Sequence, residues 1–148
     1  MRRLFIRMTL LCGVLDAIYA SIWSILAGGN VGRTWRYVAS GPLGDQAKEW
    51  GATGIFAGLA VHFLLMAVMV GAFLWIVRAP WLKAMNPWLL GTVYGLGLYL
   101  VMNGLVVPIR FGTPFNPAGI KDVLLPLFPH IAFIGIPLAL AARRIQHS

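Results

Sequence analysis

Residues 53–77 read TGIFAGLAVHFLLMAVMVGAFLWIV and contain no Asp, Glu, Lys or Arg. A helix needs about 20 apolar residues to cross the hydrocarbon core of a bilayer, and this stretch is long enough. Three further apolar stretches of comparable length occupy residues 4–26, 88–107 and 122–142. The sequence therefore predicts four transmembrane helices.

The composition also indicates a membrane protein. Of the 148 residues, 59% are hydrophobic and 11% are charged, whereas a soluble domain carries about 25% charged residues. A chain this short has too little interior to bury so much apolar surface in water. We expect one domain, residues 1–148, of the all-α integral membrane class. Its fold is predicted as a four-transmembrane-helix up-down bundle with a short interfacial helix in the first loop.

The positive charges lie at the ends of the apolar stretches. The termini and the second loop carry Arg2, Arg3, Arg7, Arg78, Lys83, Arg143 and Arg144, and the first and third loops carry Arg33, Arg36, Lys48, Arg110 and Lys121. The positive-inside rule then predicts both termini in the cytoplasm. Without a basic face or a nucleic-acid motif, the net charge of +8 indicates contact with membrane lipid and no nucleic acid. Asp16 interrupts the first apolar run, which continues to Leu26, so we expect a retained helix rather than a signal peptide.

The loops contain several expected helix boundaries. Residues 32–39, basic and aromatic, are predicted to form the interfacial helix, and residues 40–44 a turn. Asp45 is expected to cap a helix that runs into the second span. Asn86-Pro87 and Asn116-Pro117 are expected to begin the third and fourth helices, because Asn is a good N-cap and Pro suits the first helical position. This first loop is either a simple connector or a lid and docking surface.

Four polar side chains interrupt the spans, one in each: Asp16, His62, Asn103 and His130, called here the polar layer. With a rise of 1.5 Å per residue, all four are predicted about 8–13 Å from the boundary on the side of the first and third loops. Three of them belong to a stripe of small or polar residues at helical spacing: Gly13, Asp16, Tyr19, Ala20 and Ser24; Gly54, Gly58 and His62; and Gly91, Gly95, Tyr99 and Asn103. Small residues let membrane helices approach closely, so the stripes predict the bundle interior.

The fourth span contains Pro126, Pro129 and Pro137 around His130. Each proline lacks an amide donor and displaces the carbonyl four residues earlier, here those of Asp122, Leu125 and Phe133. Such carbonyls are tolerated in a membrane where protein or water satisfies them. The span is therefore either a broken helix that lines a site or a fixed kink.

The polar layer has four open uses. It can be a structural hydrogen-bond network, or a binding or proton-relay site made of Asp16, His62, Asn103, His130, Tyr19 and Tyr99. It can hold a cofactor, either a haem between His62 and His130 or a divalent metal bound by His62, His130 and Asp16. An enzyme that uses His as a base is the fourth, although no catalytic motif is present.

We expect a non-enzymatic membrane protein that binds or conducts a small solute, ion or lipid, or that serves as a subunit of a membrane complex. A transport role would favour a homo-oligomer or larger complex, because four spans are few. The alternative is the haem- or metal-binding protein that uses His62 and His130.

The chain resembles small four-span bacterial inner-membrane proteins of unassigned function. The resembling segments are residues 13–16 (GVLD), 38–44 (VASGPLG), 58–63 (GLAVHF), 94–103 (YGLGLYLVMN) and 130–137 (HIAFIGIP). The resemblance implies a location in the bacterial inner membrane and a shared polar layer. It implies no reaction, cofactor or partner.

Overall fold

The computed structural model describes residues 1–146, which are helical and contain no strand. Four helical runs are long and apolar enough to cross a membrane: Arg2–Leu26, Gly51–Ile76, Pro87–Phe111 and Ile120–Arg144. Large apolar side chains such as Phe56, Trp75 and Ile109 are more than 70% exposed on the outer surface. A soluble protein rarely exposes so much apolar surface, whereas lipid would cover it. The four predicted spans are confirmed, with small shifts at their ends.

The first two spans are the uninterrupted helices α1 (Arg2–Leu26) and α3 (Gly51–Ile76). The third consists of α5 (Pro87–Val101), a π-helical segment η2 (Met102–Val106) and α6 (Val107–Phe111). The fourth consists of α7 (Ile120–Pro129), a π-helical segment η3 (His130–Gly135) and α8 (Ile136–Gln146). The two later spans thus each contain an interruption of the α-helical hydrogen-bond pattern.

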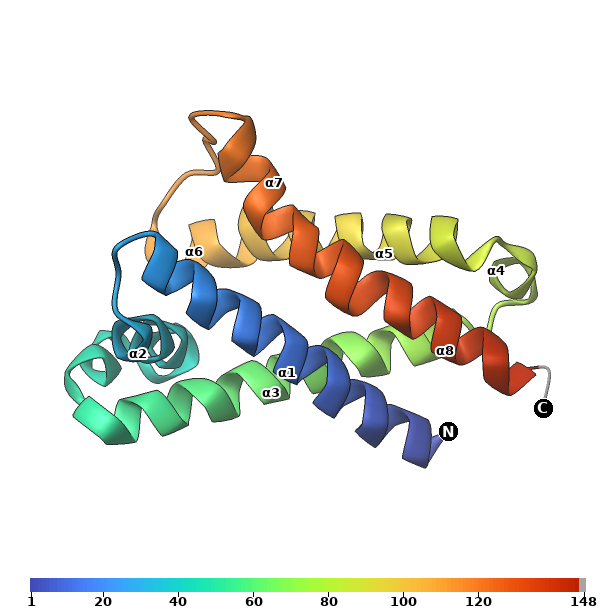
Figure 1. Cartoon of the computed structure of the whole chain (residues 1–148), viewed down its shortest axis with the longest axis horizontal. Helices are drawn as coiled ribbons and strands as arrows, with labels where there is room; N and C mark the ends of the chain where they lie inside the picture. The colour runs from blue at the N-terminus through green and yellow to red at the C-terminus, as the bar shows by residue number, and fades with distance from the viewer. Residues whose placement is uncertain (147–148) are drawn as a thin grey trace.

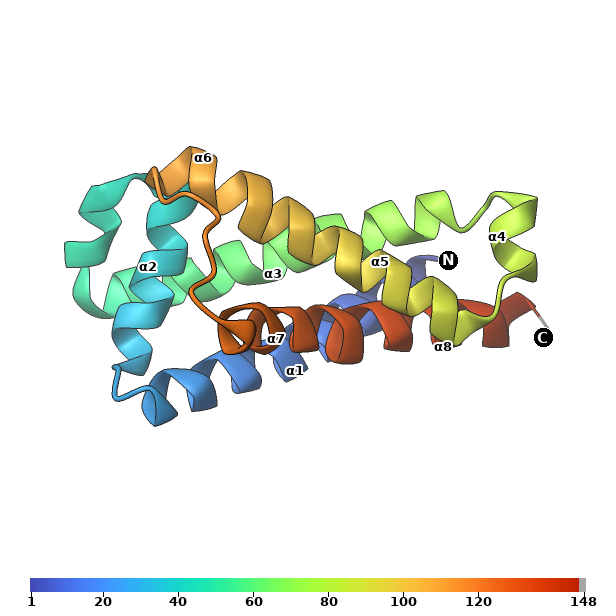
Figure 2. The same ribbon diagram turned by 90° about the horizontal axis from the view of Figure 1, so that it is seen from above.

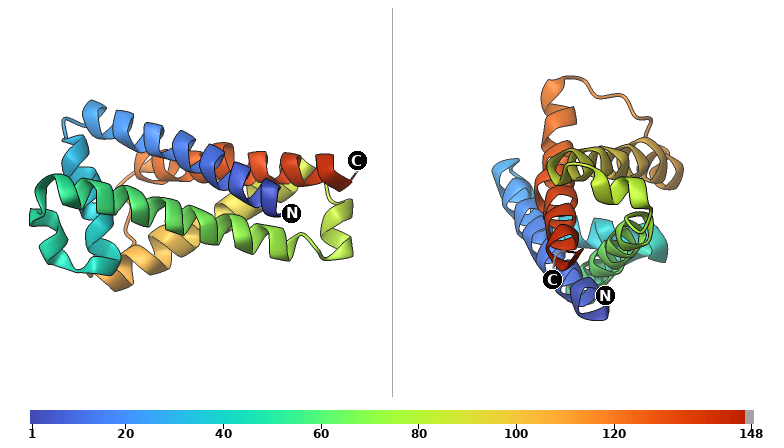
Figure 3. Two further views of the ribbon diagram at one scale, coloured as in Figure 1. Left: turned by 90° about the horizontal axis from the view of Figure 1, so that it is seen from below. Right: turned by 90° about the vertical axis from the view of Figure 1, so that its right-hand side faces the viewer.

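The spans lie along the long axis of the molecule (Figure 1). The N-terminus and the end of α8 lie at one end, together with the short helix α4 (Pro80–Ala84), which joins α3 to α5. At the other end α2 (Val31–Leu43) lies across the molecule between the ends of α1 and α6 (Figure 2). A 3₁₀ helix, η1 (Asp45–Glu49), follows α2 and leads to α3, as the view from below shows (Figure 3).

The helix of the first loop is longer than predicted. It begins where Asn30 accepts a hydrogen bond from the amide of Arg33 at 3.1 Å. It continues through the predicted turn at residues 40–44 and ends only at Gly44, whose φ is +88°. The prediction of a turn from Gly41-Pro42 was wrong, because Arg110 satisfies the carbonyls at the end of this helix, as shown below.

The other predicted helix starts have mixed outcomes. Asn86 caps α5 as predicted, accepting from the amide of Trp88 at 2.8 Å. Asn116-Pro117 does not begin the fourth span, which starts at Ile120 after a turn held by the amide of Ala118 donating to Asp122 Oδ2 at 3.0 Å. Asp45 begins η1, but this helix does not run into the second span: Trp50 lies between them, and Gly51, the first residue of α3, has a φ of +57°.

Glycines set the close approaches between helices. A Cβ on Gly91 would lie 2.6 Å from Ile136 Cα, and one on Gly95 would lie 2.6 Å from the carbonyl oxygen of His130. The third and fourth spans therefore pack backbone against backbone, as the small-residue stripe predicted. Gly54 and Gly58 differ, because a Cβ there would meet the backbones of Ala47 and Trp35. This GxxxG pair packs against η1 and α2 and not against another span.

Candidate functional site

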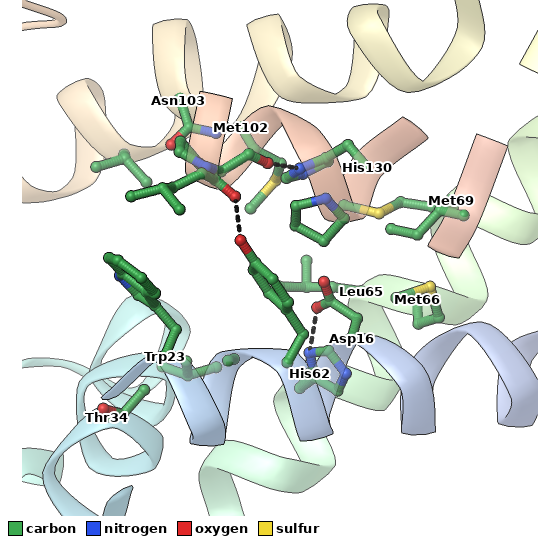
Figure 4. Close-up of a pocket in the computed structure, with 18 of the residues that line it drawn as sticks. Asp16, Trp23, Thr34, His62, Leu65, Met66, Met69, Met102, Asn103 and His130 are labelled. Carbon is green, nitrogen blue, oxygen red and sulfur yellow. Dashed lines mark hydrogen bonds and ion pairs between the residues drawn. The ribbon is translucent and has the colours of Figure 1, made fainter. Parts of the chain in front are cut away.

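The polar layer lines one cavity of about 450 Å³ between the four spans. Asp16 and Tyr19 come from α1, His62 from α3, Asn103 from η2 and His130 from the start of η3 (Figure 4). Thr34 and Val38 of α2 also line the cavity, which places it toward the end of the molecule with the first and third loops. The depth estimate and the small-residue stripes had indicated this convergence.

The two π-helical segments carry Asn103 and His130 into the cavity wall. Pro108 lies two residues after the end of η2, and Pro137 lies two residues after the end of η3. Each proline ring displaces the carbonyl four residues earlier, which is that of Gly104 or Phe133. Both of these carbonyls lie inside a π-helical segment. The wider π turn gives a displaced carbonyl room, and such turns are frequent at functional sites. Pro137 was recognised from the sequence, but Pro108 was not. Pro108 is the residue from which the irregular segment η2 could have been predicted.

Asp16 and His62 join α1 to α3. Asp16 Oδ2 lies 3.8 Å from His62 Nδ1, and His62 Nε2 lies 2.9 Å from the carbonyl oxygen of Gly13. A carbonyl only accepts hydrogen bonds, so Nε2 carries a hydrogen and donates it. The imidazole is held edge-on against Trp35 of α2, which is 4% exposed, with ring centroids 5.3 Å apart. Sequence reasoning had missed Trp35 as a neighbour of the site.

Two carbonyls near the prolines of the fourth span are satisfied by site residues. The Leu125 carbonyl, which Pro129 leaves without an amide donor, accepts from the hydroxyl of Tyr19 at 2.8 Å. The Pro126 carbonyl accepts from His130 Nδ1 at 2.6 Å, while the amide of His130 bonds to Leu127 instead. Of the carbonyls predicted to need a partner, that of Leu125 has one in Tyr19, whereas the Pro126 carbonyl bound by His130 was not among those predicted.

Asn103 and Tyr99 occupy different positions. Asn103 lines the cavity and donates from Nδ2 to the carbonyl of Tyr99 at 3.3 Å. Tyr99, a predicted site residue, is 2% exposed and does not line the cavity. Its ring lies edge-on to His130 at 6.3 Å, and its hydroxyl has no hydrogen-bond partner among residues 1–146. Tyr99 therefore packs near the ring of His130 without lining the cavity.

Apolar side chains form most of the remaining wall. They are Trp23, Leu65, Met66, Met69, Met102, Val107, Leu125 and Ile134. Methionine side chains adapt to irregular shapes, so three of them in one wall give a surface that can follow an apolar guest. Sequence reasoning did not select these residues, because apolar residues in a span carry no signal of which face they occupy.

Arg110, at the end of the third span, fixes the first loop. It donates from Nε to the carbonyl of Gly41 at 2.5 Å and from Nη2 to that of Ser40 at 2.6 Å. Its Nη2 also lies 3.4 Å from Asp45, which bonds to Lys48 at 2.9 Å. The hydrogen bond and charge of Lys48, with the charge of Arg110, lower the pKa of Asp45. The loop helix that contributes Thr34 and Val38 is thereby attached to the third span.

The geometry does not assemble the predicted metal set. Among residues 1–146, no group of three or more His, Cys, Asp or Glu side chains is arranged to hold a metal ion. Asp16, His62 and His130 therefore do not form such a group. To ligate a haem iron between the two histidines, a ring nitrogen of His62 would have to give up its contact with either the Gly13 carbonyl or the Asp16 carboxyl group. Haem and metal binding stay predictions without support from these contacts.

The chain was compared with known protein families, curated proteins and solved structures. No protein-family model, curated protein or solved structure matches the chain. The resemblance to four-span inner-membrane proteins therefore stays an expectation, and the function must be argued from the cavity itself.

Proposed function

We propose that this protein binds a small, largely apolar molecule with a polar end, inside the membrane, in the cavity lined by the polar layer. The observation that carries the proposal is the wall itself, in which apolar side chains surround Asp16, His62, Asn103 and His130. A mainly apolar pocket with a few convergent polar groups is typical of small-molecule sites.

Binding is favoured over conduction by the packing beyond the cavity. Toward the end that holds the termini, the interior is filled by Val70, Phe73, Ile134 and Leu138, each at most 1% exposed. An ion or solute that crossed the protein would have to displace this closely packed core. On this basis we propose the cavity as a binding site and not as part of a conduction path.

In this proposal the four spans form an up-down bundle in a bacterial inner membrane, with both termini in the cytoplasm. The interface at the opposite side is occupied by α2, whose Trp35 and Ala39 are buried against the bundle. Its exposed basic side chain, Arg33, then faces lipid headgroups, whereas the stem of Arg36 packs against Gly54 of α3.

Binding of 1-methylnaphthalene to protein purified in a non-ionic detergent tests this proposal. Ala20 lines the cavity, so Ala20→Trp places a bulky side chain inside it and should weaken saturable binding measured by equilibrium dialysis. Ile18, 52% exposed on the outer face of α1, gives the matched control Ile18→Trp, which should bind like the wild type. Equal binding by wild type and Ala20→Trp would show that the probe only partitions into detergent and would refute the proposal.

A further inference from the structure

Three polar side chains of the cavity, His62, His130 and Tyr19, donate hydrogen bonds to backbone carbonyls. His62 donates from Nε2 to Gly13, and His130 donates from Nδ1 to Pro126. The hydroxyl of Tyr19 donates to Leu125. A carbonyl partner fixes the direction of each bond, because it has no hydrogen to give.

The groups that remain are mainly acceptors. A neutral imidazole that carries its hydrogen on Nδ1 has a lone pair on Nε2, so His130 keeps an acceptor. Asn103 uses one amide hydrogen on Tyr99 and keeps Oδ1 and its second amide hydrogen. Tyr19 keeps only the lone pairs of its oxygen. Around Asp16, these groups thus offer several acceptors and one uncommitted donor, the second amide hydrogen of Asn103. Trp23 and Ser24, which also line the cavity, carry a donor each.

Ionised Asp16 is an acceptor on both carboxyl oxygens. Its Oδ2 lies 3.8 Å from His62 Nδ1, which is too far for a hydrogen bond. The other carboxyl oxygen points away from His62, toward the side of the cavity that holds Met102 and His130 (Figure 4). As part of a carboxylate, this oxygen accepts hydrogen bonds from a donor in the cavity.

We propose that the ligand is a primary amine on a small apolar body, bound with its ammonium group at Asp16, His130 and Asn103. This inference rests on the proposed function and names the chemical class of its ligand. An ammonium group has three donors and a positive charge, which match these acceptors and the single carboxyl group. A carboxylate ligand would place its own acceptors against those of the wall, at the cost of unpaired groups and like-charge repulsion.

Three probes with one naphthalene body test the inference: 1-naphthylmethylamine, 1-methylnaphthalene and 1-naphthoic acid. We expect the amine to bind at least about tenfold more tightly than 1-methylnaphthalene, as charge-assisted hydrogen bonds predict, and the acid to bind most weakly. Detergent micelles without protein supply the background for each probe. This comparison uses the wild-type protein, so it does not depend on whether a site variant folds.

Asp16→Asn then identifies the group responsible. It should remove the advantage of the amine over 1-methylnaphthalene, as measured by the ratio of the two affinities in the same variant. Equal affinity for amine and 1-methylnaphthalene, or tighter binding of the acid, would overturn the inference while leaving the proposed function in place. Absence of saturable binding of all three would overturn both. An amine advantage that persists in Asp16→Asn would exclude Asp16 as the recognising group.

Discussion

Arg110 donates from Nη2 to the carbonyl of Ser40, and this bond connects the end of the third span to a fully buried residue 70 positions earlier. Because Arg110 also satisfies Gly41, its removal leaves two carbonyls at the end of α2 without these donors. We expect Arg110→Met to lower the free energy of unfolding by about 1–3 kcal/mol. Arg33→Met, at an exposed position of the same loop helix, should have little effect on the thermal midpoint in detergent.

Arg110→Lys separates charge from geometry. A lysine keeps the positive charge but cannot form the two-pronged contact with Ser40 and Gly41. A midpoint for Arg110→Lys near that of Arg110→Met would support the hydrogen-bond explanation. A midpoint equal to that of the wild type would show that charge alone suffices.

Tyr19 and Pro129 should be coupled through the Leu125 carbonyl. Tyr19→Phe removes the donor to this carbonyl, and we expect a loss of about 1–3 kcal/mol because the group is left unsatisfied. Pro129→Ala restores a backbone N–H four residues after Leu125, which can then satisfy it. In the Pro129→Ala background, Tyr19→Phe should therefore cost less. A double-mutant cycle of unfolding free energies measures the coupling, and equal costs in the two backgrounds would contradict it.

Gly58 and Gly71, both in α3, should respond oppositely to alanine. A Cβ on Gly58 would overlap the carbonyl oxygen of Trp35, whereas one on Gly71 would make an ordinary contact with Phe5 at 3.6 Å. We expect Gly58→Ala to destabilise by about 1–3 kcal/mol through overpacking. Gly71→Ala should be neutral or stabilise by up to about 1 kcal/mol, since alanine favours the helix. Comparable midpoints for the two variants would refute the close approach of α2 to α3.

The pKa of Asp45 predicts a contribution to stability in acid. Lys48 and Arg110 lower this pKa below its usual value of 3.8, so the folded state favours the ionised carboxylate. The stabilisation is complete above pH 3.8 and is lost as the pH falls through the lowered pKa of the folded state. Thermal midpoints between pH 6 and pH 2.5 should fall less steeply for Asp45→Asn than for the wild type. Parallel slopes would contradict this assignment.

The sequence was sufficient to predict the four spans and the shared depth of the polar layer. Both depend on length, hydropathy and helical rise, which are local quantities. The sequence was insufficient to predict which elements pack against Gly54 and Gly58. A pair of small residues indicates that another part of the backbone approaches closely, but it does not identify that part. The continuation of α2 through Pro42 depends on Arg110, a long-range contact that no local pattern contains.

The two π-helical segments have a geometric consequence for the spans that contain them. One extra residue in a turn rotates all later side chains by about 100° around the helix axis. In the third span, Gly91 and Gly95 before the rotation face the fourth span, while Arg110 after it reaches α2. In the fourth, Leu125 and Pro126 before the rotation face the cavity, while Leu138 after it enters the packed core. In each of these spans, the residues after the π-helical segment therefore face a direction different from the one that an uninterrupted α-helix would give them. One helix can in this way contact two neighbours that lie on different sides of it.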